Sequence, residues 1–394
     1  MSHPQVLAYV HSLSADVADA LAFKKPVFDG IPNRWLIDQF KAREKAKYKL
    51  PSWYDRENLI YPALISMEQC SSEATGMYKA QLFGSGASVW DVTGGFGVDS
   101  YYLSLQAQKV VHVEPNSDLS LCVQHNFRAL GVSNVEFYTQ TFETCMQQSL
   151  IAVDHIIYID PSRRDEAKNK KFKLEDCSPN LVDWMPVLME RGHRVWCKLS
   201  AFFDISELMR IFSSWVKSIH VVAYKNDCKE LLVEFSPLHS GEVRVCCVNL
   251  DTSEPAVEAS WGATAKPELA PPFESGFLYE PNAAVLKAGL SDGFAVANGM
   301  FKLHPNTQLY YSSQPVSHFP GRCFAINYAG SLSGPLEKQF PEKKANIACR
   351  NFPISPEEVR KKLGFADGGE QYFFACTAWN QKKILIGGLK VTSN

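Results

Sequence analysis

Several features that would assign this chain to a specialised class of protein are absent from its sequence. No apolar run approaches the roughly 18 residues that a membrane-spanning helix needs. The N-terminus, MSHPQVLAYVHSL, lacks the basic flank and the long apolar core of a signal peptide. The net charge of −2 excludes the overall positive charge that is typical of many nucleic-acid-binding proteins, so any basic surface has to be local. We therefore expect a cytoplasmic protein with no membrane partner.

The eleven cysteines and ten histidines also lack the spacing of a metal site. No two cysteines form a CxxC pair and no two histidines an HxxxH pair, so no structural metal is expected. An odd number of scattered cysteines indicates reduced thiols, as in a cytosol. With 46% hydrophobic and 21% charged residues over 394 positions, the chain has the composition of a globular protein of two or three domains.

What the sequence does contain is a strand, a glycine turn, a helix and a second strand in close succession. Residues 88–92 form a short apolar run, and Thr93-Gly94-Gly95-Phe96-Gly97 and a helical segment follow it. A second apolar run, residues 109–113, ends in Glu114. This order is typical of a nucleotide-binding half of a doubly wound sheet.

The residues of the glycine loop narrow the choice of nucleotide. The loop reads D-x-T-G-G-F-G-x-D from Asp91 to Asp99, which is neither the dinucleotide pattern G-x-G-x-x-G nor a P-loop. No basic residue occurs from Asp91 to Gln108, so the loop suits a ligand with a positive or hydroxyl-rich end better than a pyrophosphate. Glu114 is placed to accept both hydroxyls of a ribose. The alternative is a tight turn with solvated acids.

These residues resemble the class I S-adenosylmethionine (SAM) methyltransferases. The resemblance implies SAM as the cofactor, with its amino acid end on the first-strand acid and the glycine loop and its ribose on the second-strand acid. The residues so assigned to SAM are Asp91, Thr93, Gly94, Gly95, Gly97, Asp99 and Glu114. Thr141-Phe142-Glu143 stands where such enzymes usually place a polar group near the adenine. The adenine contact is left between a backbone contact at Thr141 and stacking on Phe142.

A second candidate motif, Asp160-Pro161-Ser162-Arg163-Arg164, follows the fourth predicted strand, residues 155–159. Carboxyl ends of strands next to a switch point face the ligand, so we expect Asp160 across from the SAM site. In the similar D/N-P-P-aromatic motifs of amino-methyltransferases, the acid and the Pro carbonyl accept hydrogen bonds from an exocyclic amine. Here Ser162-Arg163 replaces the aromatic residue, and Arg163 suits a phosphate or a carboxylate. The alternative is a strand-end turn whose arginines form surface ion pairs.

The segment after this motif is basic. Residues 163–173 hold six bases against two acids, a local net charge of +4. In a nearly neutral protein this is where a polyanion would dock. The candidate substrate-binding residues are Arg163, Arg164, Lys171 and Lys198. Lys198 ends the fifth predicted strand, and a structural ion pair with Asp160 is an equal alternative.

The pattern along the chain predicts three domains: a helical one over 1–78, the SAM-binding βα alternation over 79–239, and an α+β one over 240–394. Helices are expected over 4–22, around 35–47 and over 61–78; the last contains E-Q-C-S-S-E, whose role the sequence does not reveal. The composition of residues 251–275, rich in Pro, Ala, Ser, Glu and Thr without periodicity, predicts a long loop. The C-terminal predictions are strands at 299–303, 308–312, 322–328, 371–378 and 382–387 and a helix at 356–363.

The order of these parts resembles bacterial methyltransferases with a THUMP-like C-terminal domain, over essentially the whole chain. The matching motifs are D-x-T-G-G-x-G-x-D, D-P-x-R-R, K-L-S, R-N-F-P and, one residue looser, G-G-x-Y-x-F; they begin at Asp91, Asp160, Lys198, Arg350 and Gly368. The resemblance implies a Rossmann-like class I sheet with a THUMP-like, ferredoxin-like C-terminal domain. THUMP domains are RNA-binding modules, so it also implies RNA (tRNA or rRNA) as the partner, with guanine N2 the suspected target.

Two other functions stay open at the level of the sequence. One is a small-molecule or protein methyltransferase on the same fold. The other is a catalytically silent RNA-binding module that retains SAM. The oligomeric state is left open as well.

Overall fold

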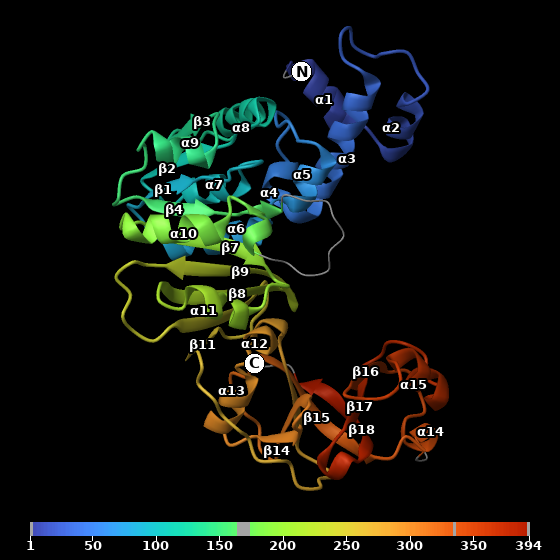
Figure 1. Cartoon of the computed structure of the whole chain (residues 1–394). Coiled ribbons are helices and arrows are strands. Elements are labelled where there is room, and N and C mark those ends of the chain that lie inside the picture. The colour runs from blue at the N-terminus through green and yellow to red at the C-terminus, as the bar shows by residue number, and fades with distance from the viewer. Residues whose placement is uncertain (1–2, 164–173, 334–335, 392–394) are drawn as a thin grey trace. The chain divides into compact units, whose positions relative to one another are not determined.

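The computed structural model describes residues 3–163, 174–333 and 336–391 (Figure 1). The chain forms two compact units. The first consists of Met1–Lys217 and Leu231–Gly241, and the second of Ser218–Glu230 and Glu242–Asn394. The boundaries of the three expected domains, at 78/79 and 239/240, stay a prediction.

Helices make up the N-terminal part of the first unit. They are α1 (Pro4–Ser12), α2 (Ala15–Leu21), α3 (Asn33–Lys49), α4 (Pro51–Tyr54), α5 (Leu64–Gln69) and α6 (Glu73–Phe83). The helix expected over 4–22 is two helices, α1 and α2. The one expected over 61–78 is also two, because the Ser72 hydroxyl accepts the Thr75 N–H and starts a new helix there.

A parallel sheet follows these helices in the first unit. Its strands are β1 (Ser88–Asp91), β2 (Lys109–Val113), β3 (Val135–Tyr138), β4 (Ile156–Ile159) and β7 (Arg194–Ser200). The order is β7-β4-β1-β2-β3, so the chain runs outward from β1 to β3 and then returns to β4 on the other side of β1. The switch point therefore lies between β1 and β4, where ligands of open α/β sheets bind at the carboxyl ends of the strands.

Five of the described helices alternate with these strands, and all but α7 begin at a polar capping residue. They are α7 (Val98–Ser104), α8 (Ser117–Ala129), α9 (Phe142–Gln147), α10 (Leu181–Glu190) and α11 (Ile205–Phe212). Asn116, Thr141, Asn180 and Asp204 each accept a backbone N–H of the first helical turn. The strand β9 (Asp227–Phe235) lies next to β7, ahead of β8 (Val216–Tyr224) in the strand order. β9 is therefore inserted between β7 and β8 in the sheet.

The second unit contains a seven-stranded sheet, in the order β13-β14-β12-β15-β18-β17-β16. Its strands are β12 (Phe277–Pro281), β13 (Phe301–His304), β14 (Thr307–Ser312), β15 (Gly321–Gly330), β16 (Asn346–Arg350), β17 (Gln371–Thr377) and β18 (Lys383–Val391). The helices are α12 (Ala283–Ala288), α13 (Ser291–Ala297), α14 (Leu336–Gln339) and α15 (Pro356–Leu363). The C-terminal strands and the helix predicted from the sequence are present, whereas β12 and β16 escaped prediction.

Two short strands of the second unit correct the sequence interpretation. β10 (Arg244–Leu250) pairs in parallel with β8, and β11 (Val257–Ser260) pairs antiparallel with β10. The loop expected over 251–275 therefore contains a strand.

The second unit also has a buried carboxylate that links three strands. Glu280 accepts hydrogen bonds from the Nε atoms of Arg322 and Arg350, each at 2.9 Å. One carboxylate thus links β12, β15 and β16.

Candidate active site

The glycine loop after β1 has little room for side chains. A Cβ atom added to Gly94 would lie 2.2 Å from Cε1 of His112, and one added to Gly97 would lie 2.6 Å from Val123. Gly97 also has a φ of 77°, the left-handed conformation that starts α7. The loop is fixed by its backbone, since the Gly94 N–H donates to the Val113 carbonyl at 2.9 Å. Glycine is therefore required at 94 and 97 by the packing of this chain.

Asp91 lies beneath this loop and is 1% exposed. Its carboxylate accepts the Ser100 hydroxyl at 2.5 Å and the Thr93 N–H at 3.3 Å. Burial raises the pKa of Asp91 to about 7, although the hydrogen bond from Ser100 opposes the shift. Asp91, predicted to hold the amino acid end of SAM, thus holds the loop to α7 in this structure.

His112 continues the same network and was not singled out by sequence reasoning. Its Nδ1 atom lies 3.0 Å from the Ser100 hydroxyl, and its ring lies against the position that a side chain at 94 would need. Burial lowers the pKa of His112 to about 3, so the ring is neutral at physiological pH. The available sequence signal was a histidine inside an apolar strand. In the structure this histidine is buried and lies opposite Asp91 in the register.

Glu114 follows β2 and faces the glycine loop. Its Oε2 atom accepts the Gly95 N–H at 3.1 Å, and its Oε1 atom accepts the Asn116 N–H at 2.8 Å. Burial raises the pKa of Glu114, and these two backbone hydrogen bonds oppose the rise. Each carboxylate oxygen has a further lone pair. The geometry therefore allows Glu114 to accept ribose hydroxyls while staying bound to the loop.

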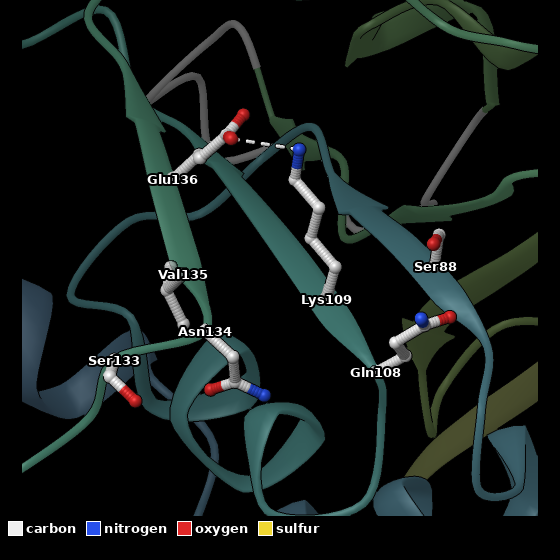
Figure 2. A pocket seen from close by; sticks show the side chains of 7 residues that line it. All are labelled: Ser88, Gln108, Lys109, Ser133, Asn134, Val135 and Glu136. Atoms are coloured by element: carbon white, nitrogen blue, oxygen red, sulfur yellow. Dashed lines mark ion pairs between the residues drawn. The ribbon is translucent and has the colours of Figure 1, made fainter.

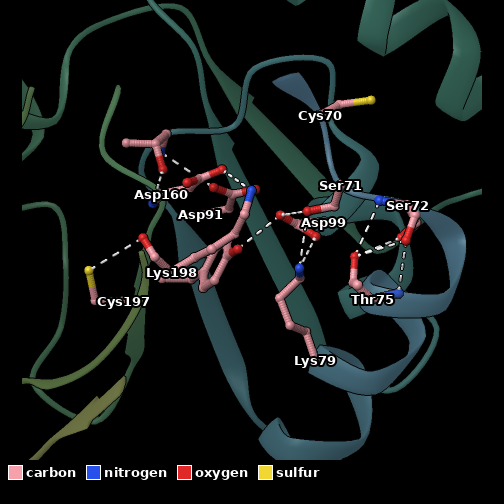
Figure 3. A network of polar contacts seen from close by, with 12 residues as sticks. Cys70, Ser71, Ser72, Thr75, Lys79, Asp91, Asp99, Asp160, Cys197 and Lys198 are labelled. Carbon is pink, nitrogen blue, oxygen red and sulfur yellow. Dashed lines mark hydrogen bonds and ion pairs between the residues drawn. The ribbon is translucent and has the colours of Figure 1, made fainter. Parts of the chain in front are cut away.

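Asp160 stands at the carboxyl end of β4 and is tied to both neighbouring strands. Its N–H donates to the Thr93 hydroxyl at 2.6 Å, and its Oδ2 atom lies 2.5 Å from Nζ of Lys198 (Figure 3). Pro161 is buried behind it. Of the two possibilities that the sequence left for Lys198, the structure has the ion pair.

Asp99, predicted to bind SAM, is surrounded by groups of this chain (Figure 3). Its Oδ2 atom accepts the hydroxyls of Ser71 at 2.8 Å and Tyr158 at 2.9 Å, and its Oδ1 atom lies 3.1 Å from Nζ of Lys79. Burial alone would raise the pKa of Asp99, but the cations Lys79 and Lys198 and these hydrogen bonds lower it. The arrangement suits a residue that positions α7.

This cluster also gives the E-Q-C-S-S-E run a structural role. The Ser71 hydroxyl accepts a hydrogen bond from Lys79 at 3.0 Å and donates one to Asp99. Ser72 begins α6, the helix that carries Lys79. The run therefore links the N-terminal helices to the helix after the glycine loop.

The predicted adenine contacts lie at the start of α9. Thr141 is exposed, and its hydroxyl accepts the Thr144 N–H, which caps the helix. Phe142 is 2% exposed, and its ring packs edge to face on Trp184 with centroids 4.9 Å apart. Because this ring is covered, the structure does not support stacking of an adenine on Phe142. The alternative of a backbone contact stays a prediction.

Part of the predicted substrate site lies outside the described residues. This is so for Arg164, Lys171 and most of the basic segment 163–173. Arg163 is described only by its backbone: β5 (Ser162–Arg163) pairs antiparallel with β6 (Cys177–Ser178). The substrate roles of these residues stay predictions.

A cavity of about 410 Å³ lies at the other edge of the sheet (Figure 2). It is lined by Ser88, Gln108, Lys109, Ser133, Asn134, Val135 and Glu136. Ser88, Lys109 and Val135 are the first residues of β1, β2 and β3, so this cavity is at the amino ends of the strands. An ion pair of 2.8 Å joins Lys109 to Glu136 there. The cavity is separate from the predicted SAM site.

Comparisons with known proteins cover both units of the chain. The THUMP domain-like family matches residues 321–388, and a ferredoxin-like domain matches residues 277–320. Two uncharacterized SAM-dependent methyltransferases, from two strains of Mycobacterium tuberculosis, are 24% identical over 346 residues, which is 84% of this chain and 88% of theirs. A crystal structure from Porphyromonas gingivalis W83, described as that of a methyltransferase, is 28% identical over the whole of both chains, with a TM-score of 0.88.

The chain is a SAM-dependent methyltransferase, and its residues 321–388 match a THUMP domain-like family. The predicted Rossmann-like sheet and the THUMP-like, ferredoxin-like C-terminal part are confirmed. S-adenosylmethionine is the cofactor of this class, and the residues at the switch point suit it. The turn at Gly95 has no side chain to block the approach of SAM, and the Glu114 carboxylate oxygens can accept the two ribose hydroxyls.

The part of this methyltransferase that the structure describes contains no group of three or more His, Cys, Asp or Glu side chains placed to hold a metal ion. Within the same residues, no helix is long and apolar enough to cross a bilayer. All eleven cysteines lie among the described residues, and none of them forms a disulfide.

Proposed function

We propose that this methyltransferase transfers the methyl group of SAM to a nitrogen of a base in RNA, with the exocyclic N2 of guanine as the suspected target. The observation that carries the proposal is the position of Asp160. Its carboxylate follows β4 at the switch point, its backbone is bound to Thr93 of the glycine loop, and Lys198 engages its Oδ2 atom.

In this mechanism Asp160 orients the acceptor. Its Oδ1 atom and the Pro161 carbonyl accept hydrogen bonds from the exocyclic amine, which directs the nitrogen lone pair toward the methyl group. When bound, SAM would supply the electrophilic methyl group and leave as S-adenosylhomocysteine, and the proton that the amine loses would pass to water. The protein acts through proximity and orientation, which contribute up to about 7–11 kcal/mol in favourable cases.

RNA is the acceptor that the C-terminal part favours, because residues 321–388 match a THUMP domain-like family. In the proposal, Arg163 and the basic residues after it hold phosphates close to Asp160, since guanidinium groups bind phosphate in a bidentate manner. Arg164 and Lys171 belong to the same proposed phosphate site. Glu114, Asp91, Thr93 and the glycines at 94, 95 and 97 form the proposed SAM site.

The test compares wild-type protein with Asp160→Ala and with Asp154→Ala, an exposed carboxylate before the opposite end of β4. Each protein is given radiolabelled SAM and total RNA from a strain that lacks this gene, and SAM affinity is measured by calorimetry. We expect Asp160→Ala to bind SAM as wild type does and to transfer methyl groups more than about 100-fold more slowly. Asp154→Ala is expected to behave as wild type.

Other outcomes would decide against the proposal. If wild-type protein methylated a small molecule or a protein in cell extract but no RNA, the RNA acceptor would be wrong. If wild-type protein bound SAM and RNA without transfer, and Asp160→Ala complemented the deletion strain fully, the chain would be a silent RNA-binding module.

A further inference from the structure

An exposed aromatic side chain follows the strand that adjoins Asp160. Phe202 is 90% exposed, and it stands in the loop between β7 and α11, four residues after Lys198. Burial of a phenylalanine side chain is favourable, so the exposed ring of Phe202 leaves the free energy of burial available to a ligand. A ligand that covers the ring would recover this free energy.

The backbone that carries Phe202 is held from both sides. The Phe202 N–H donates to the Ser200 hydroxyl at 3.3 Å, and the Phe203 N–H donates to the Ser200 carbonyl at 2.9 Å. Phe203 is buried in the protein. Asp204 caps α11 by accepting the Ser206 N–H at 2.8 Å. The exposure of Phe202 therefore belongs to an ordered turn that directs this one ring to solvent.

The sheet register places the strand that leads into this turn beside the strand that Asp160 follows. β4 and β7 pair in parallel with Ile159 opposite Cys197, so Asp160 and Lys198 both follow at the same level. Their ion pair shows that the two strand ends are in contact. Phe202 thus follows the carboxyl end of the strand that adjoins the acceptor site. The motif at Asp160 has no aromatic residue of its own, because Ser162 and Arg163 take that place.

We propose that Phe202 is the stacking surface for the target base, and that it holds the plane of an unstacked RNA base so that its exocyclic amine faces Asp160. This inference rests on the proposed function and names a residue that positions its substrate. Every base has a π-face, so the ring would orient the base while Asp160 and Pro161 select the amine.

The experiment compares Phe202→Ala, Phe202→Tyr and the matched control Phe23→Ala with wild type. Phe23 is 93% exposed and follows α2 in the helical N-terminal part, so its removal deletes an equally exposed ring. Methyl transfer from SAM to total RNA of the deletion strain is followed over RNA concentration. Retention of the same RNA on filters is measured with S-adenosylhomocysteine present, and SAM affinity is measured by calorimetry.

We expect Phe202→Ala to lower the rate of transfer at limiting RNA about 10-fold to 100-fold, from the contribution of base–aromatic stacking. RNA retention should weaken less than transfer does, because phosphate contacts dominate the affinity of a long RNA. SAM affinity and the melting temperature should stay as in wild type. Phe202→Tyr keeps the ring and should restore most of the rate, and Phe23→Ala should match wild type.

The outcomes separate this inference from the function on which it rests. If wild type and Phe202→Ala transferred methyl groups to RNA at the same rate, the role of Phe202 would be wrong and the proposed function would stand. A loss in Phe202→Ala that Phe202→Tyr fails to restore would also overturn it, since a ring would still be present. If wild type binds SAM but transfers no methyl group to RNA, both are wrong.

Discussion

The Nζ atom of Lys79 lies 3.1 Å from the Oδ1 atom of Asp99, and both side chains are buried. Lys79 belongs to α6 and Asp99 to α7, so this ion pair joins the N-terminal helices to the helix after the glycine loop. The Ser71 hydroxyl hydrogen-bonds to both members of the pair, and the Tyr158 hydroxyl donates to Asp99. The N-terminal helices thereby help to fix the proposed SAM loop.

We expect Lys79→Met to destabilise the protein by about 3–5 kcal/mol, because it removes the cation in direct contact with the buried Asp99 carboxylate. Urea unfolding followed by tryptophan fluorescence measures the change. The double variant Lys79→Met/Asp99→Asn should lose less stability than Lys79→Met alone, since no uncompensated charge remains.

An exposed ion pair on neighbouring helices is the control for this prediction. Lys45 lies 3.0 Å from Glu68, and both side chains are about half exposed. Lys45→Met should therefore cost less than about 1 kcal/mol. Equal unfolding midpoints for Lys79→Met and Lys45→Met would show that the buried pair contributes nothing special.

The raised pKa of Asp91 predicts a pH dependence of stability. With a folded pKa of about 7 and an ordinary value of 3.8, the folded protein keeps the Asp91 proton over a range in which the unfolded chain has lost it. Unfolding then releases a proton, so the contribution of Asp91 to stability is fully present below about pH 4 and is lost as the pH rises to about 7. The loss is at most about 4 kcal/mol.

Calorimetric melting of wild type and Asp91→Asn from pH 5 to pH 8 tests this prediction. Asn has no proton to lose, so the melting temperature of the variant relative to wild type should rise with pH and become constant above about pH 7. Parallel curves would contradict the raised pKa of Asp91. Other groups that titrate in this range affect both proteins equally.

The glycine loop provides a prediction on cofactor binding. We expect Gly94→Ala to abolish measurable SAM binding, because its Cβ atom would lie 2.2 Å from a buried histidine ring that has no room to move. At Gly95 the nearest atom to an added Cβ is 3.8 Å away, so Gly95→Ala should cost only the left-handed backbone, about 1 kcal/mol. Calorimetric titration of SAM into both folded variants measures this, and equal affinities would refute it.

Local signals explain how much of this site could be predicted from the sequence. The strand, the glycine turn, the helix and Glu114 lie within 27 residues, and each has a composition that specifies its own conformation. The strand-end position of Asp160 followed from βα alternation alone. β10 was missed because the apolar run RVCCVNL stands among residues of loop-like composition.

The contacts that complete the site depend on packing between distant segments. Asp160 and Lys198 are 38 positions apart and meet because β4 adjoins β7. The ring of Phe142 is covered by Trp184 of a later helix, which no local pattern indicates. Ser71 and Asp99 likewise come together through the packing of α6 on α7. The sequence offered the Asp160–Lys198 ion pair only as one of two alternatives, and it gave no protein partner for Phe142 or Asp99.

The ion pair between Lys198 and Asp160 gives the last prediction. Lys198→Met removes the cation that fixes the Asp160 carboxylate, and a misplaced acceptor group can cost about 100-fold in rate. We expect the kcat of RNA methylation to fall by that order while the KM for RNA and the affinity for SAM stay close to wild type. Lys198→Arg restores a cation and should recover part of the rate.

The control for this prediction is Lys217→Met. Lys217 pairs with Glu234, and Glu234 keeps Arg194 as a second partner when Lys217 is replaced. A rise in KM with kcat unchanged would instead mean that Lys198 contacts the RNA, the alternative that its sequence position allowed.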